Sequence, residues 1–259
     1  SIQQPRVSCI LRHILAVRSF GQMARHLFAG ALTRFFSNDW LTELDVEARA
    51  TGTEIRQITP DGRPVGKTNP ELIEPNILAW RDYITKQLLK NAGHRVQWQE
   101  GMLPPYATGS MGWPALGALY VWAAYAEDST IPPERAIDAP FEDPVFLARS
   151  SADDGFELLP TLLCAYWLPC PAGFLIECQG PLDGEDRIIV GSTGQLRFAL
   201  NRINETTWKA SPDEIAAWRA RYAQDRAPVL MRSARYAYSV FCDVLAYAER
   251  NELPIRLRI

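Results

Sequence analysis

The side chains that could act as nucleophiles or metal ligands are few and far apart in this sequence. The 259 residues include five cysteines, Cys9, Cys164, Cys170, Cys178 and Cys242, and three histidines, His13, His26 and His94. Zinc sites use closely paired cysteines and histidines, whereas the three central cysteines are separated by five and seven residues. We therefore predict no metal site and no cofactor. A cysteine nucleophile activated by a histidine stays open, because the two side chains need to meet only in space.

Carboxylates offer a second route to chemistry. Asp153 lies four residues before Glu157, and Glu142 is adjacent to Asp143. Glycoside hydrolases use two such carboxyl groups as acid and base. Any acidic surface contains pairs of this kind, however, and the sequence has no G-x-S-x-G, H-E-x-x-H or G-x-x-x-x-G-K-[ST] motif. The lack of a recognisable catalytic motif therefore leads us to predict that the protein is not an enzyme.

The charges are unevenly distributed along the chain. Residues 127–187 carry thirteen acidic residues against three arginines, a net charge of −10, whereas the whole chain carries −3. Residues 1–38 have five arginines and no acid, and residues 197–259 have a net charge of +4. Acidic side chains that share one face attract a cationic partner and speed up association; otherwise they only solubilise loops. The acidic excess argues against nucleic-acid binding, since phosphate contacts need basic residues.

We predict a partner-binding surface on two acidic loops, 142–157 and 183–186. Its candidate residues are Glu142, Asp143, Asp153, Asp154, Glu157, Asp183, Glu185 and Asp186. Trp167 and Phe174 neighbour these loops. They would either anchor a partner, as buried aromatic residues do in many interfaces, or belong to the core.

The first 38 residues allow two interpretations. An arginine-rich, acid-free segment is typical of a transit peptide. The apolar residues at positions 10, 14 and 17, and again at 23, 27, 28, 32 and 35, have helical spacing instead. We therefore predict two helices divided near Gly21. The odd number of cysteines fits reduced thiols better than a disulfide framework, so we predict a cytoplasmic protein.

The uncharged stretch 103–126 could be a membrane span, part of a ligand pocket or the middle of a soluble core. A membrane span needs about 20 continuous apolar residues, and this stretch is interrupted by prolines and glycines. Pro114 suits the first turn of a helix, which would run to about Ala126 and be apolar on nearly all sides. Such a helix is typical of a buried core, so we predict no membrane association.

Capping signals and apolar spacing place the other elements. Further helices are expected over 40–50, 70–91 with a break near Pro75, 194–202, 211–223 and 228–251. An irregular connection over 129–155 should precede β-like runs at 156–167, 173–178 and 187–190, with a last strand at 253–259. Strands and helices do not alternate regularly, so we predict a mainly helical α+β fold with a small, mostly antiparallel sheet. One compact domain, 1–259, would comprise a helical part (1–128), the acidic connection and strands (129–192) and a C-terminal part (193–259).

Two stretches resemble immunity proteins of bacterial polymorphic toxin systems. The first is GWPALGALYVW, residues 112–122, and the second joins LAYAE, 245–249, to LPIRL, 253–257. The likeness covers about a third of the chain and consists of packing motifs, so no binding residue can be transferred from it. It implies a cytoplasmic, non-enzymatic protein that binds one secreted toxin and blocks it. Many such toxins attack nucleic acids through basic clefts, which an acidic partner can plug.

These observations together predict an antitoxin whose acidic loops bind a cognate protein toxin with a basic surface. The alternative is a small hydrolase or transferase that uses Cys170 or a carboxylate pair in a pocket near Trp113. A third possibility is a structural subunit, in which Trp122 on the apolar helix would form part of an oligomer interface. The sequence predicts neither the identity of the toxin nor the oligomeric state.

Overall fold

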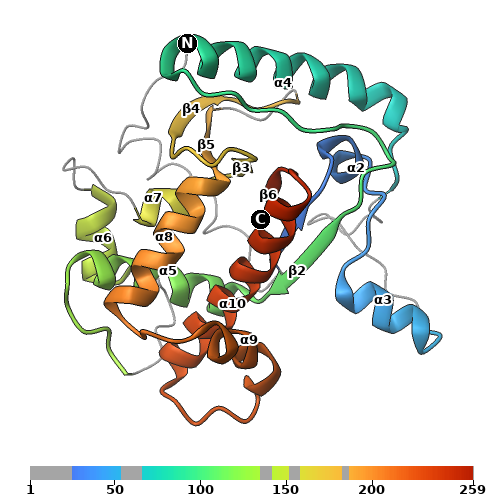
Figure 1. Ribbon diagram of the computed structural model, residues 1–259. Helices are drawn as coiled ribbons and strands as arrows, with labels where there is room; N and C mark the ends of the chain where they lie inside the picture. The colour runs from blue at the N-terminus through green and yellow to red at the C-terminus, as the bar shows by residue number, and fades with distance from the viewer. Residues whose placement is uncertain (1–24, 54–65, 135–141, 152–157, 183–186, 259) are drawn as a thin grey trace.

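A six-stranded sheet forms the centre of the computed structural model, which describes residues 25–53, 66–134, 142–151, 158–182 and 187–258 (Figure 1). The strands are β1 (Arg25–Ala29), β2 (Ala107–Met111), β3 (Tyr166–Leu168), β4 (Leu175–Gln179), β5 (Arg187–Ser192) and β6 (Ile255–Arg258). Their order across the sheet is β2-β1-β6-β3-β5-β4. All neighbours pair antiparallel except β3 and β5, which are parallel. The predicted α+β fold with a mostly antiparallel sheet is confirmed.

Helices cover both faces of this sheet. The larger core lies under α5 (Trp113–Glu127), α7 (Leu158–Leu162), α8 (Thr193–Thr206) and α10 (Val229–Arg250), and the second core under α2 (Leu32–Phe36) and α4 (Pro70–Ala92) (Figure 1). Alternate residues of a strand point to opposite faces. In β5, accordingly, Ile189 enters the larger core while Ile188 and Val190 enter the second. The remaining helices are α3 (Glu43–Ala50), α6 (Pro144–Ser151) and α9 (Pro212–Arg221).

The two stretches that carry the resemblance form the middle of the larger core. Helix α5 packs along α10, and eleven of its fifteen residues are buried. The prediction of a buried helix after Gly112 is therefore confirmed. Within the described parts of the chain, no helix combines the length and the apolar character that crossing a membrane requires.

Capping residues located the helices well. The Asn69 side chain accepts a hydrogen bond from the Glu71 amide at 3.1 Å, and α4 ends at Gly93, whose φ of 68° is left-handed. In α9, Ser211 and Glu214 form the expected capping box. Helix α4 is continuous through Pro75, so the predicted break there is wrong. Pro75 lies in the second turn, and its ring faces solvent.

Four segments differ from the sequence prediction. Residues 25–29 form a buried strand instead of a helix, since their apolar spacing is compatible with both. Strand β2 was not predicted, because ATGSM has little strand propensity. Helix α7 lies within the β-like run predicted over 156–167, whose described part forms a strand, β3, only at its end, and α6 lies in the connection expected to be irregular. The first predicted helix, before Gly21, lies outside the described residues.

Candidate functional site

Asp143, one of the predicted partner-binding residues, lies in the interior. Its carboxylate accepts hydrogen bonds from the amides of Val145 and Phe146, both at 3.0 Å, and from the Tyr125 hydroxyl at 3.2 Å. Asp143 therefore caps the start of α6 and ties it to α5. Glu142 is exposed. The other candidates, Asp153, Asp154, Glu157, Asp183, Glu185 and Asp186, lie outside the described residues, and their role stays a prediction.

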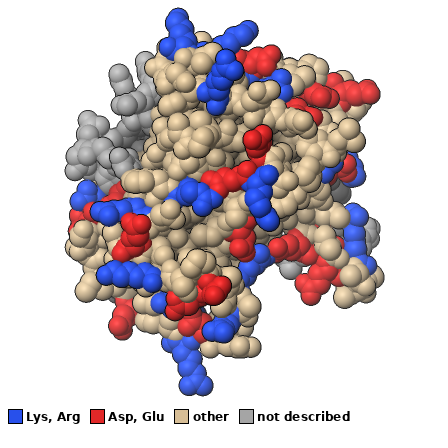
Figure 2. Space-filling model, viewed as in Figure 1, with Lys and Arg blue, Asp and Glu red and all other residues tan. Residues whose placement is uncertain are grey.

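Other acids of the segment 127–187 also serve the fold. Asp128 forms an ion pair with Arg149 at 2.5 Å, and the buried Glu177 pairs with Arg187 at 2.6 Å. The Glu127 carboxylate accepts a hydrogen bond from the Leu158 amide. On the face shown in Figure 2, basic and acidic side chains are interspersed and do not separate into two halves. Part of the acidic excess is therefore neutralised within the chain.

Cys170 and Trp113, two residues of the enzymatic alternative, are not brought together, whereas Asp153 and Glu157 lie outside the described residues. Cys170 is buried in the second core, whereas Trp113 packs against the larger core across the sheet. Burial also raises the pKa of the Cys164 thiol, which disfavours the reactive thiolate. Among the residues that the structure describes, no three His, Cys, Asp or Glu side chains come together as they would around a metal ion.

The aromatic residues considered as anchors belong to the core. Trp167 is fully buried, and Phe174 is buried in the second core. Trp122 is also buried, and its ring stacks on that of Trp208 with 5.2 Å between centroids. An oligomer interface built on Trp122 is therefore not compatible with its position.

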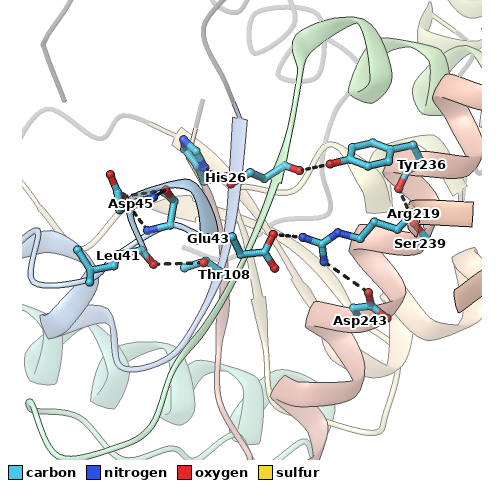
Figure 3. A network of polar contacts seen from close by, with 11 residues as sticks. His26, Leu41, Glu43, Asp45, Thr108, Arg219, Tyr236, Ser239 and Asp243 are labelled. Carbon is cyan, nitrogen blue, oxygen red and sulfur yellow. Dashed lines mark hydrogen bonds and ion pairs between the residues drawn. The ribbon is translucent and has the colours of Figure 1, made fainter. Parts of the chain in front are cut away.

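What the structure does bring together is a polar network at the outer edge of β2 (Figure 3). The Thr108 hydroxyl donates to the Leu41 carbonyl at 3.2 Å, which holds the start of α3 against β2. On the other side, Tyr236 of α10 donates its hydroxyl hydrogen to the Ser110 carbonyl at 3.1 Å. Edge strand β2 is thus held between α3 and α10.

Arg219 of α9 links the two sides of this edge. Its guanidinium pairs with Glu43 at the start of α3 and lies 3.7 Å from the carboxylate of Asp243 in α10 (Figure 3). The Glu43 and Asp243 side chains are about half exposed. Because exposed ion pairs contribute little stability, this arrangement orients α3 more than it stabilises the fold.

His26 and Ser110 face each other across β1 and β2, with 2.9 Å between Nδ1 and Oγ. Burial, followed by the nearby Arg258 and by Arg25, lowers the pKa of His26 to about 4, although Asp45 acts in the opposite direction. The imidazole is therefore neutral at pH 7 and a weak base. The contact between His26 and Ser110 therefore supports the pairing of β1 with β2 rather than activation of the Ser110 hydroxyl.

This lowered pKa predicts a pH dependence of stability. The unfolded chain protonates His26 near its ordinary pKa of 6.5, whereas the folded protein protonates it only near 4. Stability is thus lost as the pH falls below 6.5. We expect His26 to contribute a loss of about 2 kcal/mol between pH 7.5 and 5, measured by urea unfolding. His26→Gln should remove this pH-dependent loss of stability, whereas His94→Gln should retain it. Equal dependence of stability on pH in the two variants would contradict the assignment of the loss to His26.

A groove of about 520 Å³ lies between α3 and the beginning of β2. Its lining residues are Leu41, Glu43, Val46, Glu47, Ala50, Tyr106, Ala107 and Thr108. Apolar side chains form most of this surface, and Val46 is 55% exposed. The two charged lining residues, Glu43 and Glu47, are both acidic and lie one helical turn apart. Figure 2 shows acidic side chains gathered where α3 meets the body of the molecule.

Sequence reasoning missed this groove. Thr42 and Asp45 have the spacing of a capping box, which the structure confirms, and this signal would have placed Glu43 and Glu47 on the first turns of a helix. No local signal brings β2 beside that helix. No family model, no curated protein and no solved structure matches this chain.

Proposed function

We propose that this chain is an immunity protein, which binds a cognate protein toxin in the cytoplasm and blocks it. The observation that carries the proposal is the groove between α3 and β2, which combines an apolar lining with two carboxylates. Interfaces need a desolvated apolar part for affinity and charges for partner choice. The resemblance of 112–122 and 245–257 to immunity proteins supports the same class.

We prefer the groove between α3 and β2 to the acidic loops 142–157 and 183–186 as the docking surface. Helix α6, which precedes residues 152–157 of one predicted loop, lies across the molecule from α3 (Figure 1). Because several acids near the loops are engaged within the chain, we place the toxin at the groove.

Co-purification with the toxin encoded by the neighbouring gene tests the proposal. We expect a complex, and growth of cells that produce both proteins. Glu43→Lys combined with Glu47→Lys should weaken binding at least about tenfold, equivalent to about 1.4 kcal/mol, in calorimetry. Because both carboxylates are exposed, the melting temperature should change little.

Reversal of the loop charges is the matched control. The combined substitution Asp153→Lys, Asp154→Lys, Glu185→Lys and Asp186→Lys changes more charges than the groove variant does. We expect it to leave the affinity nearly unchanged. Loss of binding in this variant alone would move the interface to the loops, and absence of any toxin complex would contradict the immunity function.

A further inference from the structure

We propose that the groove receives an extended, basic segment of the partner, which adds to the outer edge of β2 as a seventh strand. The inference rests on the proposed function only for the identity of the partner as a toxin. The mode of binding follows from the backbone of β2 and from the chemistry of the groove.

The ladder hydrogen bonds determine which backbone groups of β2 point outward. The Gly30 amide donates to the Pro254 carbonyl at 3.0 Å, so the even-numbered residues of β1 face β6 and the odd-numbered ones face β2. In β2, therefore, Ala107, Gly109 and Met111 face β1. The backbone N–H and C=O groups of Thr108 and Ser110 point to the outer edge.

The outer edge is only partly occupied. Tyr236 donates to the Ser110 carbonyl. Within the residues that the structure describes, neither the Thr108 N–H nor its C=O meets a hydrogen-bond partner, and Thr108 lines the groove. A strand edge with unpaired backbone groups is a template for an added strand. The Thr108 N–H and C=O groups are thus positioned to pair with an incoming backbone.

The groove beside this edge selects the side chains of such a strand. Alternate side chains of an added strand would point toward α3, where Val46 and Ala50 present apolar surface and Glu47 a carboxylate. Glu43 is already held by Arg219 at one end of the groove. Charge complementarity therefore favours lysine or arginine between apolar residues, and disfavours an acidic segment.

Amide hydrogen exchange of the full chain, followed by NMR, tests this mode without the toxin. The probe is an end-blocked octapeptide that alternates valine and lysine. At saturating peptide we expect the Thr108 amide to exchange about tenfold more slowly or slower still, while the Gly109 amide, which faces β1, is unchanged. A valine–glutamate octapeptide should not slow exchange of the Thr108 amide. The valine–lysine peptide methylated on alternate backbone nitrogens should not slow it either, because it lacks the N–H donors that pair with the strand edge.

Two substitutions at one position separate the backbone from the side chain. Thr108→Val and Thr108→Pro both lose the hydroxyl bond to Leu41, but only proline also lacks the outward N–H. Proline is tolerated on edge strands where its nitrogen faces outward. We expect Thr108→Pro to bind the lysine peptide at least about tenfold more weakly than Thr108→Val.

Several results would overturn the inference. These are failure of the lysine peptide to bind, its binding without protection of Thr108, and equal affinity of the proline and valine variants. Protection that rises with protein concentration in the absence of peptide would assign the edge to a second copy of this chain. A toxin that binds both Thr108 variants equally would overturn the added-strand mode but not the immunity function. Binding of the lysine peptide without binding of the toxin would overturn the immunity function but not the added-strand mode.

Discussion

Replacing Gly194 with alanine should lower the free energy of unfolding by about 3 kcal/mol or more, because the added methyl group meets backbone that cannot move aside. A Cβ at this position would fall on the Pro171 carbonyl oxygen, at 2.6 Å from the Pro171 carbonyl carbon and 3.0 Å from the Cys170 oxygen. The Cys170 carbonyl is held by the Gly194 amide at 2.9 Å and by the Thr193 hydroxyl. The loop before β4 and the start of α8 would have to separate.

Two other glycines provide graded controls. A Cβ at Gly173 would lie 2.5 Å from Oε1 of Gln195, the far end of a flexible side chain that can rotate away. No heavy atom of the described chain lies within 4 Å of a Cβ at Gly66. Gly173→Ala should therefore cost about 1 kcal/mol, and Gly66→Ala should be neutral or slightly stabilising, because alanine restricts the unfolded chain.

Thermal and urea unfolding of the three variants measures this order. For a chain of this length, about 3 kcal/mol corresponds to a fall of roughly 10 °C in melting temperature. If Gly194→Ala aggregates during expression, the Gly173 and Gly66 variants still test the order of the two milder effects. Three equal melting temperatures would show that the contact between the Pro171 carbonyl and α8 is not rigid.

Local signals were enough to predict most helices, and several of these begin at a residue whose side chain satisfies free backbone amides. Asn69 and Ser211 cap α4 and α9 as expected, and the apolar run after Gly112 forms the central α5. The fold class followed from the absence of regular strand–helix alternation. These features depend on neighbours in the sequence, so no tertiary information was needed.

The sheet edge could not be predicted in the same way. Strand β2 exists because Gly109 lets its backbone approach α10: a Cβ there would lie 2.5 Å from a methyl group of Val240 and 2.9 Å from one of Val244. Nothing near Gly109 in the sequence indicates this contact. The groove is likewise a product of the register, since Thr108 reaches Leu41 only when β2 pairs with β1. Both the strand and the site result from long-range packing.

The prediction of an acidic binding surface did not consider that a carboxylate can instead cap a helix. Asp143 looked like its exposed neighbour Glu142 in the sequence, yet it is buried as a helix cap. A Pro residue directly after it, Pro144, is typical of the first position of a helix. An aspartate before a proline and an apolar run is thus better interpreted as an N-cap than as a surface charge.

Asp143→Ala should consequently lower stability by about 2–3 kcal/mol. The substitution leaves the amides of Val145 and Phe146 without their acceptor, and it removes the acceptor of the Tyr125 hydroxyl. Loss of an N-cap costs about 1 kcal/mol, and loss of the hydrogen bond from the half-buried Tyr125 hydroxyl to a carboxylate costs about 1.5 kcal/mol more. Urea unfolding should show the lower midpoint with an unchanged slope.

Asn at position 143 is the conservative control, because its amide oxygen can still cap α6 and its amide group can donate to Tyr125. We expect Asp143→Asn to cost less than half as much as Asp143→Ala, and Glu142→Ala to cost little, since that side chain is exposed. If Asp143 served a partner instead, Asp143→Ala would weaken toxin binding at an unchanged melting temperature. A lower melting temperature with unchanged toxin affinity, measured below the transition, would assign the Asp143 carboxylate to the fold.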